Sequence, residues 1–213
     1  MKRTHAMAGF SFDAVRERYF SKEQCAAIRA ATIGIAGAGG LGSNCAMNLV
    51  RTGFEKFVIA DGDAVDLSNL NRQAYFPEHI GRPKVECLRE LLLKINPACA
   101  IAAIRATVDA SNAPSLFKSC GVVVEAFDTP ECKAMIVNAF AGSGKLVVGA
   151  SGLAGYGNSD RIVTRKVGDD FYLVGDGVSG VGKNGRPLAP CVNIAAAKQA
   201  DVVLEWVLEK VDG

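Results

Sequence analysis

Short apolar segments alternate with longer amphipathic segments along most of the chain. The apolar segments are rich in β-branched residues or alanine and are bounded by glycine, proline or charge, which predicts buried strands. They cover residues 32–36, 56–60, 99–104, 121–127 and 145–150. Residues 81–97 show apolar positions at helical spacing, with a proline near each end of the segment. Strands separated by helices predict a mainly parallel α/β sheet with helices on both faces.

The pattern changes after the fifth predicted strand. Residues 161–167 and 171–176 predict two antiparallel strands joined through Gly168-Asp169-Asp170. We therefore expect an antiparallel extension of the sheet near the C-terminal part of the chain. Residues 175–190 have no core pattern and predict a loop, and a last helix is predicted over residues 191–210.

No linker, repeat or low-complexity block interrupts the sequence, so we expect a single domain over residues 1–213. Residues 1–31 predict a helical arm before the first strand, and residues 21–31 carry its clearest helical pattern. Hydrophobic residues make up 49% of the chain, yet no apolar run approaches the length of a membrane span. The first residues lack the apolar core of a signal peptide, so we expect a cytoplasmic protein with no membrane partner.

The net charge and the cysteine pattern limit the ligands and partners that we expect for the protein. The net charge is +2 with acids and bases interspersed, which argues against a nucleic-acid partner and still allows a local anionic ligand. Seven cysteines are present and none belongs to a C-x-x-C pair, so we expect no structural zinc. Their odd number and apolar neighbours predict reduced, mostly buried thiols.

A glycine-rich loop follows the first predicted strand. Gly37, Gly39 and Gly42 form a G-x-G-x-x-G motif, and Asp61 ends the next strand about 20 residues further on. Glycines let the backbone approach a phosphate, and a helix N-terminus supplies N–H donors and partial positive charge. These features predict a Rossmann-like nucleotide site with Asp61 as the ribose ligand. A purely structural turn is the alternative, because glycine also serves tight turns.

The glycine loop does not identify the nucleotide. An NAD-dependent oxidoreductase would need a catalytic acid or base, and the two histidines are poor candidates for that role. His5 lies in a terminus that we expect to be loosely held, and His79 is expected on a surface loop. Neither Ser-His-Asp nor Cys-His chemistry gains support from these positions.

Charged and amide side chains follow the second and fourth predicted strands. Arg72 lies in an amide-rich segment, Lys84 opens the next helix and Asp128 comes just after the fourth strand. Ligands of an open α/β sheet bind at the carboxyl ends of strands, so we expect these side chains to face the glycine loop. Two cations and one carboxylate suit a triphosphate with Mg²⁺, and Asn69 and Gln73 would add uncharged hydrogen bonds.

Each charged residue also has an ordinary interpretation. Arg72 would make a surface ion pair, Lys84 would be a simple first-turn lysine, and Asp128 would cap the helix that follows it. A cation at a helix N-terminus opposes the helix dipole, so Lys84 in that position indicates a purpose other than helix stability.

Four segments resemble the ThiF/MoeB family, which is related to ubiquitin-activating enzymes: "GIAGAGGLGSN", "ADGD…DLSNLNRQ", "IGRPK" and "EAFDTPECKA". The resemblance covers about residues 18–208. It implies that the protein binds MgATP, with Asp128 on Mg²⁺, and adenylates the C-terminal Gly-Gly carboxylate of a ubiquitin-like protein. The ATP-binding positions implied by the resemblance are Gly39, Gly40, Asp61, Asn69, Arg72, Gln73 and Lys84.

Departures from the family pattern limit the expected chemistry. The C-x-x-C zinc pairs of longer members are missing, and the family's acid-asparagine pair is here Asp128-Thr129. The cysteine that some members carry before the "AP" segment has no counterpart near Gly182, and Cys191 is a poor nucleophile candidate at the start of a helix. We therefore expect adenylation without thioester chemistry. The chain most resembles short ThiF proteins of thiamine thiazole biosynthesis, whose partner is the ubiquitin-like sulfur carrier ThiS.

The resemblance also implies a homodimer in which an N-terminal arginine enters the partner's ATP site and stabilises the polyphosphate. The segment "VRERYF" makes Arg18 the first candidate for this catalytic role and Arg16 the second. An amphipathic arm whose arginines face water is the alternative.

Two other functions stay open on the sequence alone. A related adenylating enzyme would serve a molybdopterin carrier, a peptide or a tRNA nucleoside, although the near-neutral charge disfavours tRNA. A nonenzymatic nucleotide-binding scaffold would keep the fold without the reaction.

Overall fold

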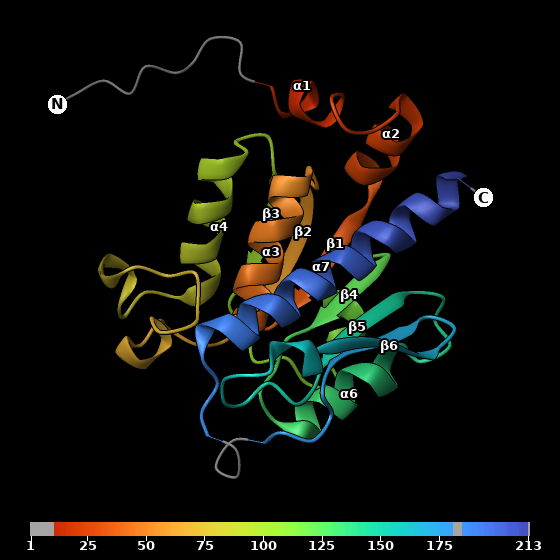
Figure 1. Ribbon diagram of the computed structural model, residues 1–213. Helices are drawn as coiled ribbons and strands as arrows, with labels where there is room; N and C mark the ends of the chain where they lie inside the picture. The colour runs from red at the N-terminus through yellow and green to blue at the C-terminus, as the bar shows by residue number, and fades with distance from the viewer. Residues whose placement is uncertain (1–10, 181–184, 213) are drawn as a thin grey trace, which may run out of the picture.

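The computed structural model describes residues 11–180 and 185–212, and within these ranges the strands form one seven-stranded sheet of order β3-β2-β1-β4-β5-β7-β6 (Figure 1). The strands are β1 (Thr32–Ala36), β2 (Lys56–Ala60), β3 (Ala100–Ile104), β4 (Val122–Glu125), β5 (Leu146–Ala150), β6 (Val163–Gly168) and β7 (Phe171–Gly175). The helices are α1 (Phe12–Arg16), α2 (Lys22–Ala30), α3 (Gly40–Thr52), α4 (Lys84–Ile95), α5 (Ala113–Leu116), α6 (Pro130–Phe140) and α7 (Ala189–Asp212). Short 3-10 turns are η1 (Leu67–Asn69), η2 (Pro77–His79) and η3 (Ser159–Arg161).

The sheet is parallel from β3 through to β7, and β6 joins its far edge antiparallel to β7. The expected antiparallel extension is confirmed, although β7 itself continues the parallel sheet beside β5. Because the strands of this parallel part point the same way, their carboxyl ends share one edge. The loops that leave this edge are the ones that can build a common site.

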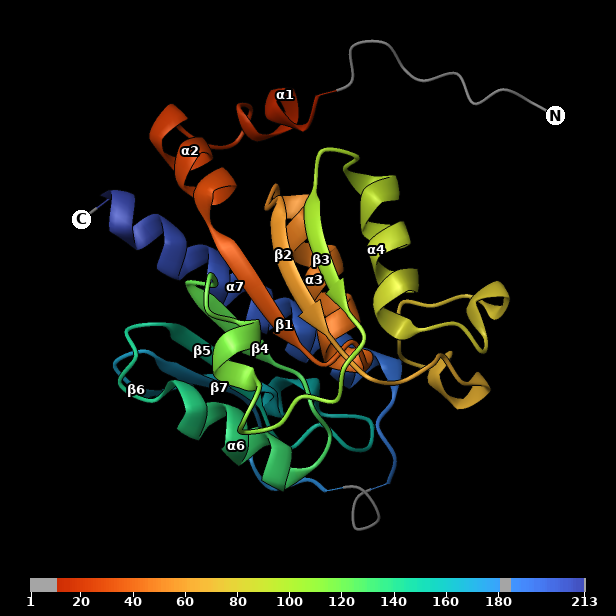
Figure 2. The same cartoon turned by 180° about the vertical axis from the view of Figure 1, so that it is seen from behind.

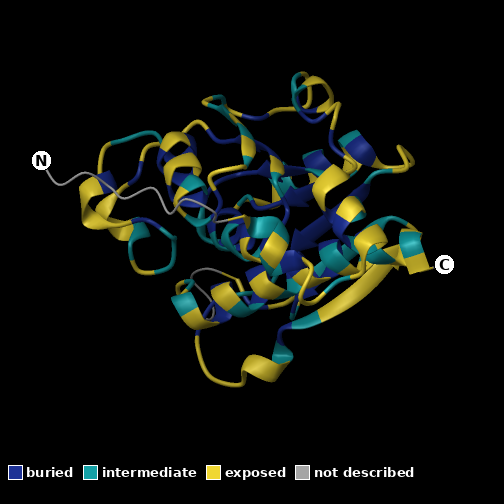
Figure 3. Cartoon of the chain, turned by 90° about the horizontal axis from the view of Figure 1, so that it is seen from above, coloured by how far each residue is buried: buried dark blue, intermediate teal, exposed yellow. Residues whose placement is uncertain are grey.

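Helices cover both faces of the sheet, as the alternating pattern predicts. The helices α3, α4 and α7 lie on one face, and α5 and α6 lie on the other (Figures 1 and 2). Successive strand residues enter opposite cores: Val122 and Val124 belong to the first cluster and Val123 to the second. Figure 3 shows buried residues gathered at the centre of the molecule and exposed residues on the outer turns of the helices. Burial on both faces explains why the central strands β1, β2, β4 and β5 are largely apolar runs.

The helix predicted over residues 81–97 is shorter in the structure. Gly81 has a φ of +84° and Pro83 is extended, with a ψ of 131°, so α4 begins at Lys84 and ends at Ile95. Pro83 is therefore the N-cap residue instead of a member of the first turn. The shift places the Lys84 side chain at the carboxyl edge of the sheet, where it is 7% exposed.

The cysteines are free and mostly buried, as expected. The buried ones are Cys25, Cys45, Cys87, Cys120 and Cys191, and those of intermediate exposure are Cys99 and Cys132. Burial raises the pKa of the Cys99 and Cys120 thiols to about 11 each, which keeps both protonated at neutral pH. Among the helices within residues 11–180 and 185–212, none combines the length and the apolar character needed to cross a membrane.

The N-terminal arm packs at the amino edge of the sheet, and α2 lies against α7 (Figure 1). Arg16, at the end of α1, is 2% exposed and donates to the Gly53 carbonyl at 2.6 Å and to Glu55 Oε1 at 2.8 Å. It also pairs with Asp13. The interpretation of Arg16 as a residue for a partner's site is therefore wrong, because its guanidinium anchors the arm to its own chain.

Replacing Arg16 by Met is expected to lower the free energy of unfolding by roughly 3 kcal/mol, because the change leaves the Glu55 carboxylate without its buried partner. Urea denaturation followed by circular dichroism measures the loss. Arg29→Met is the matched control, since Arg29 also pairs with Asp13 but both side chains are about half exposed. The control should change stability by about 0.5 kcal/mol or less. Equal losses in the two variants would contradict the anchoring role.

Candidate nucleotide-binding site

The glycine loop connects β1 to α3, and two of its glycines are required by packing. Gly37 has a φ of +99° and donates to the Ala60 carbonyl at 2.9 Å. A Cβ at Gly42 would lie 1.8 Å from the Gly37 carbonyl oxygen. Gly40 is nearly as restricted, with Val192 Cγ1 at 3.0 Å from its Cβ position. The loop thus folds tightly onto itself and onto the start of α7.

Gly39 is different, because its Cβ position has room around it. The only heavy atom within 4 Å of that position is Gln73 Nε2 at 3.8 Å, among the contacts of the described residues outside the immediate chain neighbours. Gly39 is the N-cap of α3 and makes no side-chain cap, so the first turn of this 13-residue helix presents its N–H groups to the open side. A helix N-terminus of this kind attracts anions.

Asp61, at the end of β2, binds the glycine loop directly. One carboxylate oxygen accepts the Ala38 N–H at 2.7 Å, and the other accepts the Asp63 N–H at 2.8 Å. The residue is 9% exposed. A carboxylate oxygen can accept a second hydrogen bond, so these contacts are compatible with the predicted ribose contact without testing it.

The amide-rich segment after η1 lies on the start of α3. Asn44 Nδ2 donates to the Gly40 carbonyl at 2.7 Å and to the Arg72 carbonyl at 2.9 Å. The Arg72 side chain passes within 3.5 Å of the Gly40 Cβ position, and its Nη1 donates to the Ser68 carbonyl and to Asn71. Its partners are neutral oxygens, so its charge is not neutralised by them.

The two predicted amide ligands are held differently. Asn69 Oδ1 accepts the Asp66 N–H at 3.0 Å in a reciprocal cap of η1. Gln73 faces Gly39, and its Oε1 is a buried atom without a hydrogen-bond partner within the part of the chain that the structure describes. A buried unpaired amide oxygen calls for an explanation, and a hydroxyl or amino group of a ligand would supply the missing donor.

Lys84 opens α4 and pairs with an exposed acid. Its Nζ lies 2.7 Å from Asp63 Oδ2, and the Asp63 side chain is 73% exposed. Tyr75 connects this region to the glycine loop: its hydroxyl lies 2.7 Å from the Ala38 carbonyl and 3.3 Å from the Lys84 carbonyl. Burial, followed by the negative charge of Asp61, raises the pKa of Tyr75, so the hydroxyl stays a donor at neutral pH.

Asp128 lies on a turn that touches the glycine loop from the other side. Ala126 donates to the Ala36 carbonyl at 2.9 Å, and a Cβ at Gly37 would lie 2.9 Å from the Ala126 carbonyl oxygen. Thr129 caps α6, with its Oγ1 accepting the Cys132 N–H, so the helix-cap interpretation of Asp128 is wrong. The Asp128 side chain is exposed and carries no hydrogen bond or ion pair to other described residues.

The structure therefore brings together the predicted residues of the glycine loop, Asp61, Arg72, Gln73, Lys84 and the turn that carries Asp128. Arg18 is exposed on the turn that follows α1, and α1 lies at the opposite end of the sheet from its carboxyl edge (Figure 1). Gly182 and His5 lie outside the described residues. Among the residues that the structure does describe, no group of three or more His, Cys, Asp or Glu side chains could hold a metal ion.

The expectation that His79 lies on the surface is wrong. His79 is 2% exposed, and its Nδ1 accepts the Phe76 N–H at 3.0 Å. Its ring lies edge-on to the Tyr75 ring, with 6.1 Å between the two ring centroids. The histidine thus supports the turn that carries Tyr75, and it does not face the site. Cys191 is also buried, at 2% exposure.

Sequence reasoning missed three residues that shape the site. Ser43 Oγ accepts the Ala74 N–H at 3.1 Å, while Asn44 and Tyr75 make the contacts described above. A signal was present for two of them, since Ser43 and Asn44 are polar residues directly after the glycines of the loop. Tyr75 gave no comparable signal, because a tyrosine in a loop has many uses.

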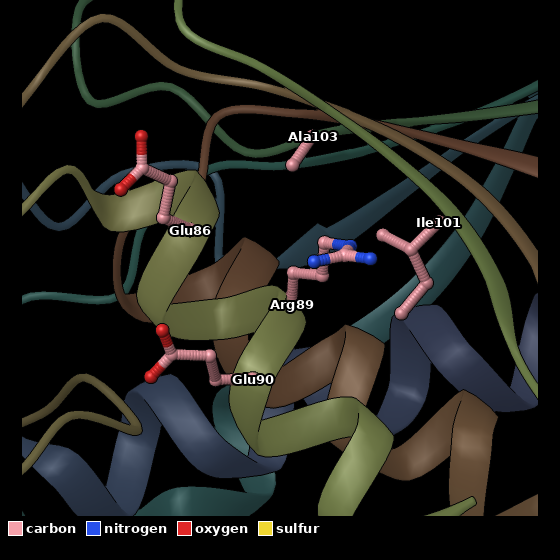
Figure 4. A pocket seen from close by; sticks show the side chains of 5 residues that line it. All are labelled: Glu86, Arg89, Glu90, Ile101 and Ala103. Atoms are coloured by element: carbon pink, nitrogen blue, oxygen red, sulfur yellow. The ribbon is translucent and has the colours of Figure 1, made fainter. Parts of the chain in front are cut away.

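A hollow of about 460 Å³ lies elsewhere, between α4 and the edge strand β3. It is lined by Glu86, Arg89, Glu90, Ile101 and Ala103. Figure 4 shows the Arg89 guanidinium directed toward Ile101, while the two glutamates point away from it. Glu90 is already paired with Arg82. None of these five residues belongs to the nucleotide site described above, so the hollow is separate from that site.

The fold and the loops at its carboxyl edge define a Rossmann-like α/β domain. The chain belongs to the ThiF family, whose sequence pattern matches residues 14–210. This confirms the relationship to ThiF/MoeB adenylyltransferases that the four sequence segments indicated.

Relatives and solved structures agree with this assignment. The chain is 30% identical over 187 residues to "Adenylyltransferase and sulfurtransferase UBA4" of Candida glabrata, covering 85% of this chain and 43% of that protein. It is 34% identical over 152 residues to the Aspergillus clavatus protein of the same name, covering 68% and 31% respectively. The chain thus spans less than half the length of these curated relatives.

Among solved structures, E. coli tRNA N6-threonylcarbamoyladenosine dehydratase, TcdA, in complex with ATP has a TM-score of 0.81 at 20% identity, covering 92% of this chain and 93% of that one. E. coli MccB with ATP has a TM-score of 0.69 at 19% identity, covering 88% and 59% respectively. At these identities the likeness establishes the fold.

Two glycines of the loop should respond differently to alanine. Gly42→Ala is expected to lower the free energy of unfolding by about 3 kcal/mol, because the new methyl group collides with the Gly37 carbonyl. Gly39→Ala has room for its methyl group at a φ of −78°, so it should stay within about 0.5 kcal/mol of the wild type. Urea denaturation compares the two variants. A strongly destabilised Gly39→Ala would show that the open side of the loop is filled by protein.

Proposed function

We propose that the protein adenylates a carboxylate with ATP, and that its substrate is the C-terminal Gly-Gly of a ubiquitin-like sulfur carrier of the ThiS type. The observation that carries the proposal is the meeting of the open α3 N-terminus at Gly39, the cations Arg72 and Lys84, and the turn of Asp128 at one edge of the sheet. Membership of the ThiF family and the similarity to UBA4, named as an adenylyltransferase, support the same reaction.

In the proposed reaction a carboxylate oxygen of the carrier attacks the α-phosphorus of ATP. The bond from that phosphorus to the bridging oxygen of the β-phosphate breaks, and an acyl-adenylate and pyrophosphate form. No general base is needed, because a C-terminal carboxylate is ionised at neutral pH. The residues need only align the reactants and balance charge on the phosphates, which suits a site without a facing histidine.

Different side chains at this edge would contact different parts of the MgATP. The glycine loop and the start of α3 would receive phosphate oxygens, and Asp61 and Gln73 would bind the ribose. Lys84 is held by the exposed Asp63 carboxylate, so the ammonium can exchange this partner for a phosphate. Asp128 would bind Mg²⁺ together with phosphate oxygens, since the protein alone supplies too few ligands among its described residues. The ion, when bound, neutralises phosphate charge.

Replacing Arg72 or Lys84 by Ala should reduce ATP–pyrophosphate exchange about 10- to 150-fold each, because each change removes a charge-assisted contact worth roughly 1.5–3 kcal/mol. Radiolabelled pyrophosphate incorporation into ATP measures this effect. Arg82→Ala is the matched control: Arg82 lies two residues before Lys84 and pairs with the exposed Glu90. Near-normal exchange in both test variants would assign Arg72 and Lys84 purely structural roles.

The choice of substrate is tested with the same assay. Exchange should require a ubiquitin-like carrier ending in Gly-Gly and should disappear when these two glycines are removed from the carrier. Exchange that depends on a molybdopterin carrier, a peptide or a tRNA nucleoside instead would replace the ThiS-type substrate and keep the adenylation. MgATP binding without exchange for any of these substrates would support a nonenzymatic scaffold.

The proposed enzyme is a homodimer, and Arg18 is the arm residue expected to reach the partner's site. Arg18 is exposed, whereas Arg16 is fixed within its own chain. An inactive Lys84→Ala chain and an inactive Arg18→Ala chain should together regain one working site when mixed, because each supplies the group that the other lacks. Exchange assays on the mixture measure the recovery. No recovery, while labelled subunits demonstrably exchange, would exclude action across the interface.

A further inference from the structure

The last residue of β4 is a buried carboxylate that the proposed reaction does not use. Glu125 is 1% exposed, and its carboxylate accepts the Phe127 N–H at 2.8 Å and the Lys133 ammonium at 3.2 and 3.3 Å. Burial raises the pKa of Glu125, and Lys133 opposes that rise. A carboxylate at this depth requires a partner, and Lys133 of α6 supplies it.

Lys133 binds the other backbone polar group of Phe127. Its Nζ donates to the Phe127 carbonyl at 2.6 Å as well as to Glu125. The Lys133 ammonium thus contacts both oxygens of a buried carboxylate and one carbonyl oxygen. The pair fixes both backbone polar groups of Phe127, the residue directly before Asp128.

A third element braces the same strand end. Gln199 of α7 is fully buried, and its Nε2 donates to the carbonyls of Glu125 and Val148 at 3.1 Å each. This amide ties the end of β4 and the middle of β5 to the long helix α7. The backbone is thus held at each step up to Asp128, whose side chain is exposed.

We infer that Glu125 and Lys133 are positioning residues that fix the backbone on both sides of Phe127 and thereby aim Asp128 at the glycine loop. The inference rests on the proposed function, in which Asp128 binds Mg²⁺. Phe127 lies against that loop, with its Cδ1 3.3 Å from the Gly37 Cβ position. A rotation of the Phe127 peptide would turn Asp128 away without unwinding α6, because Thr129 caps that helix independently.

Lys133→Met is the direct test, read as the Mg²⁺ concentration that gives half-maximal ATP–pyrophosphate exchange. This concentration should rise at least five-fold while the KM for the carrier stays unchanged, and Lys133→Arg should restore most of the wild-type value. Glu125→Gln should shift the Mg²⁺ requirement in the same direction, and it serves as the test variant if Lys133→Met does not fold.

Lys145→Met is the matched control for a purely structural effect. Lys145 also anchors backbone, donating to the Lys118 and Cys120 carbonyls at 2.9 and 2.5 Å, but it does so before β4 begins. Its loss should lower thermal stability and leave the Mg²⁺ requirement unchanged. If Lys133→Met behaves like Lys145→Met, the positioning role is overturned.

Asp128→Asn separates failure of the inference from failure of the proposed function. A raised Mg²⁺ requirement in Asp128→Asn, with no further rise when Lys133→Met is added, shows that the residues act as one unit. Additive effects overturn the positioning role. An unchanged requirement in Asp128→Asn removes the proposed role of Asp128 and the inference with it. If the wild type shows no exchange at all, the proposed function fails, and the Mg²⁺ dependence of ATP binding by calorimetry decides the inference with the same variants.

Discussion

The carboxylate of Asp61 is the contact on which the carboxyl edge of the sheet depends. Its two oxygens accept the backbone N–H groups of Ala38 and Asp63, so a single side chain fixes the glycine loop relative to the segment that pairs with Lys84. Two backbone donors that would otherwise be left unpaired in a half-buried loop are satisfied by it.

The ion pairs of Arg16, Lys84 and Lys133 differ in how far the acidic partner is exposed to solvent. The partners of Arg16 and Lys133 are the nearly buried carboxylates of Glu55 and Glu125, with side chains 15% and 2% exposed, and both pairs hold backbone in place. Lys84 is itself buried, but its partner Asp63 is 73% exposed. A pair whose acid is exposed to water is screened and can be exchanged, whereas a pair whose acid is buried is costly to break. This contrast distinguishes the cation available to a ligand from the cations that maintain the fold.

Much of the fold and part of the site were predictable from the sequence. The central strands appeared as apolar runs because burial on both faces demands them, and the glycine spacing predicted the loop correctly. The errors concern contacts between distant segments. His79 was expected at the surface but is buried against Tyr75, and Arg16 was a candidate for a partner's site although it binds Gly53 and Glu55. Neither contact leaves a periodic pattern in the sequence.

The sequence by itself determined the class of fold, the position of the glycine loop and the family, because these depend on local periodicity and on short motifs of fixed spacing. The tertiary structure alone decided which polar groups meet. Gln199 reaches the Glu125 carbonyl across 74 positions of the chain, and Asn44 reaches Arg72 across 28. Hydrogen bonds and ion pairs depend on distance and burial in space, and a linear pattern contains neither quantity until the strands and helices have packed.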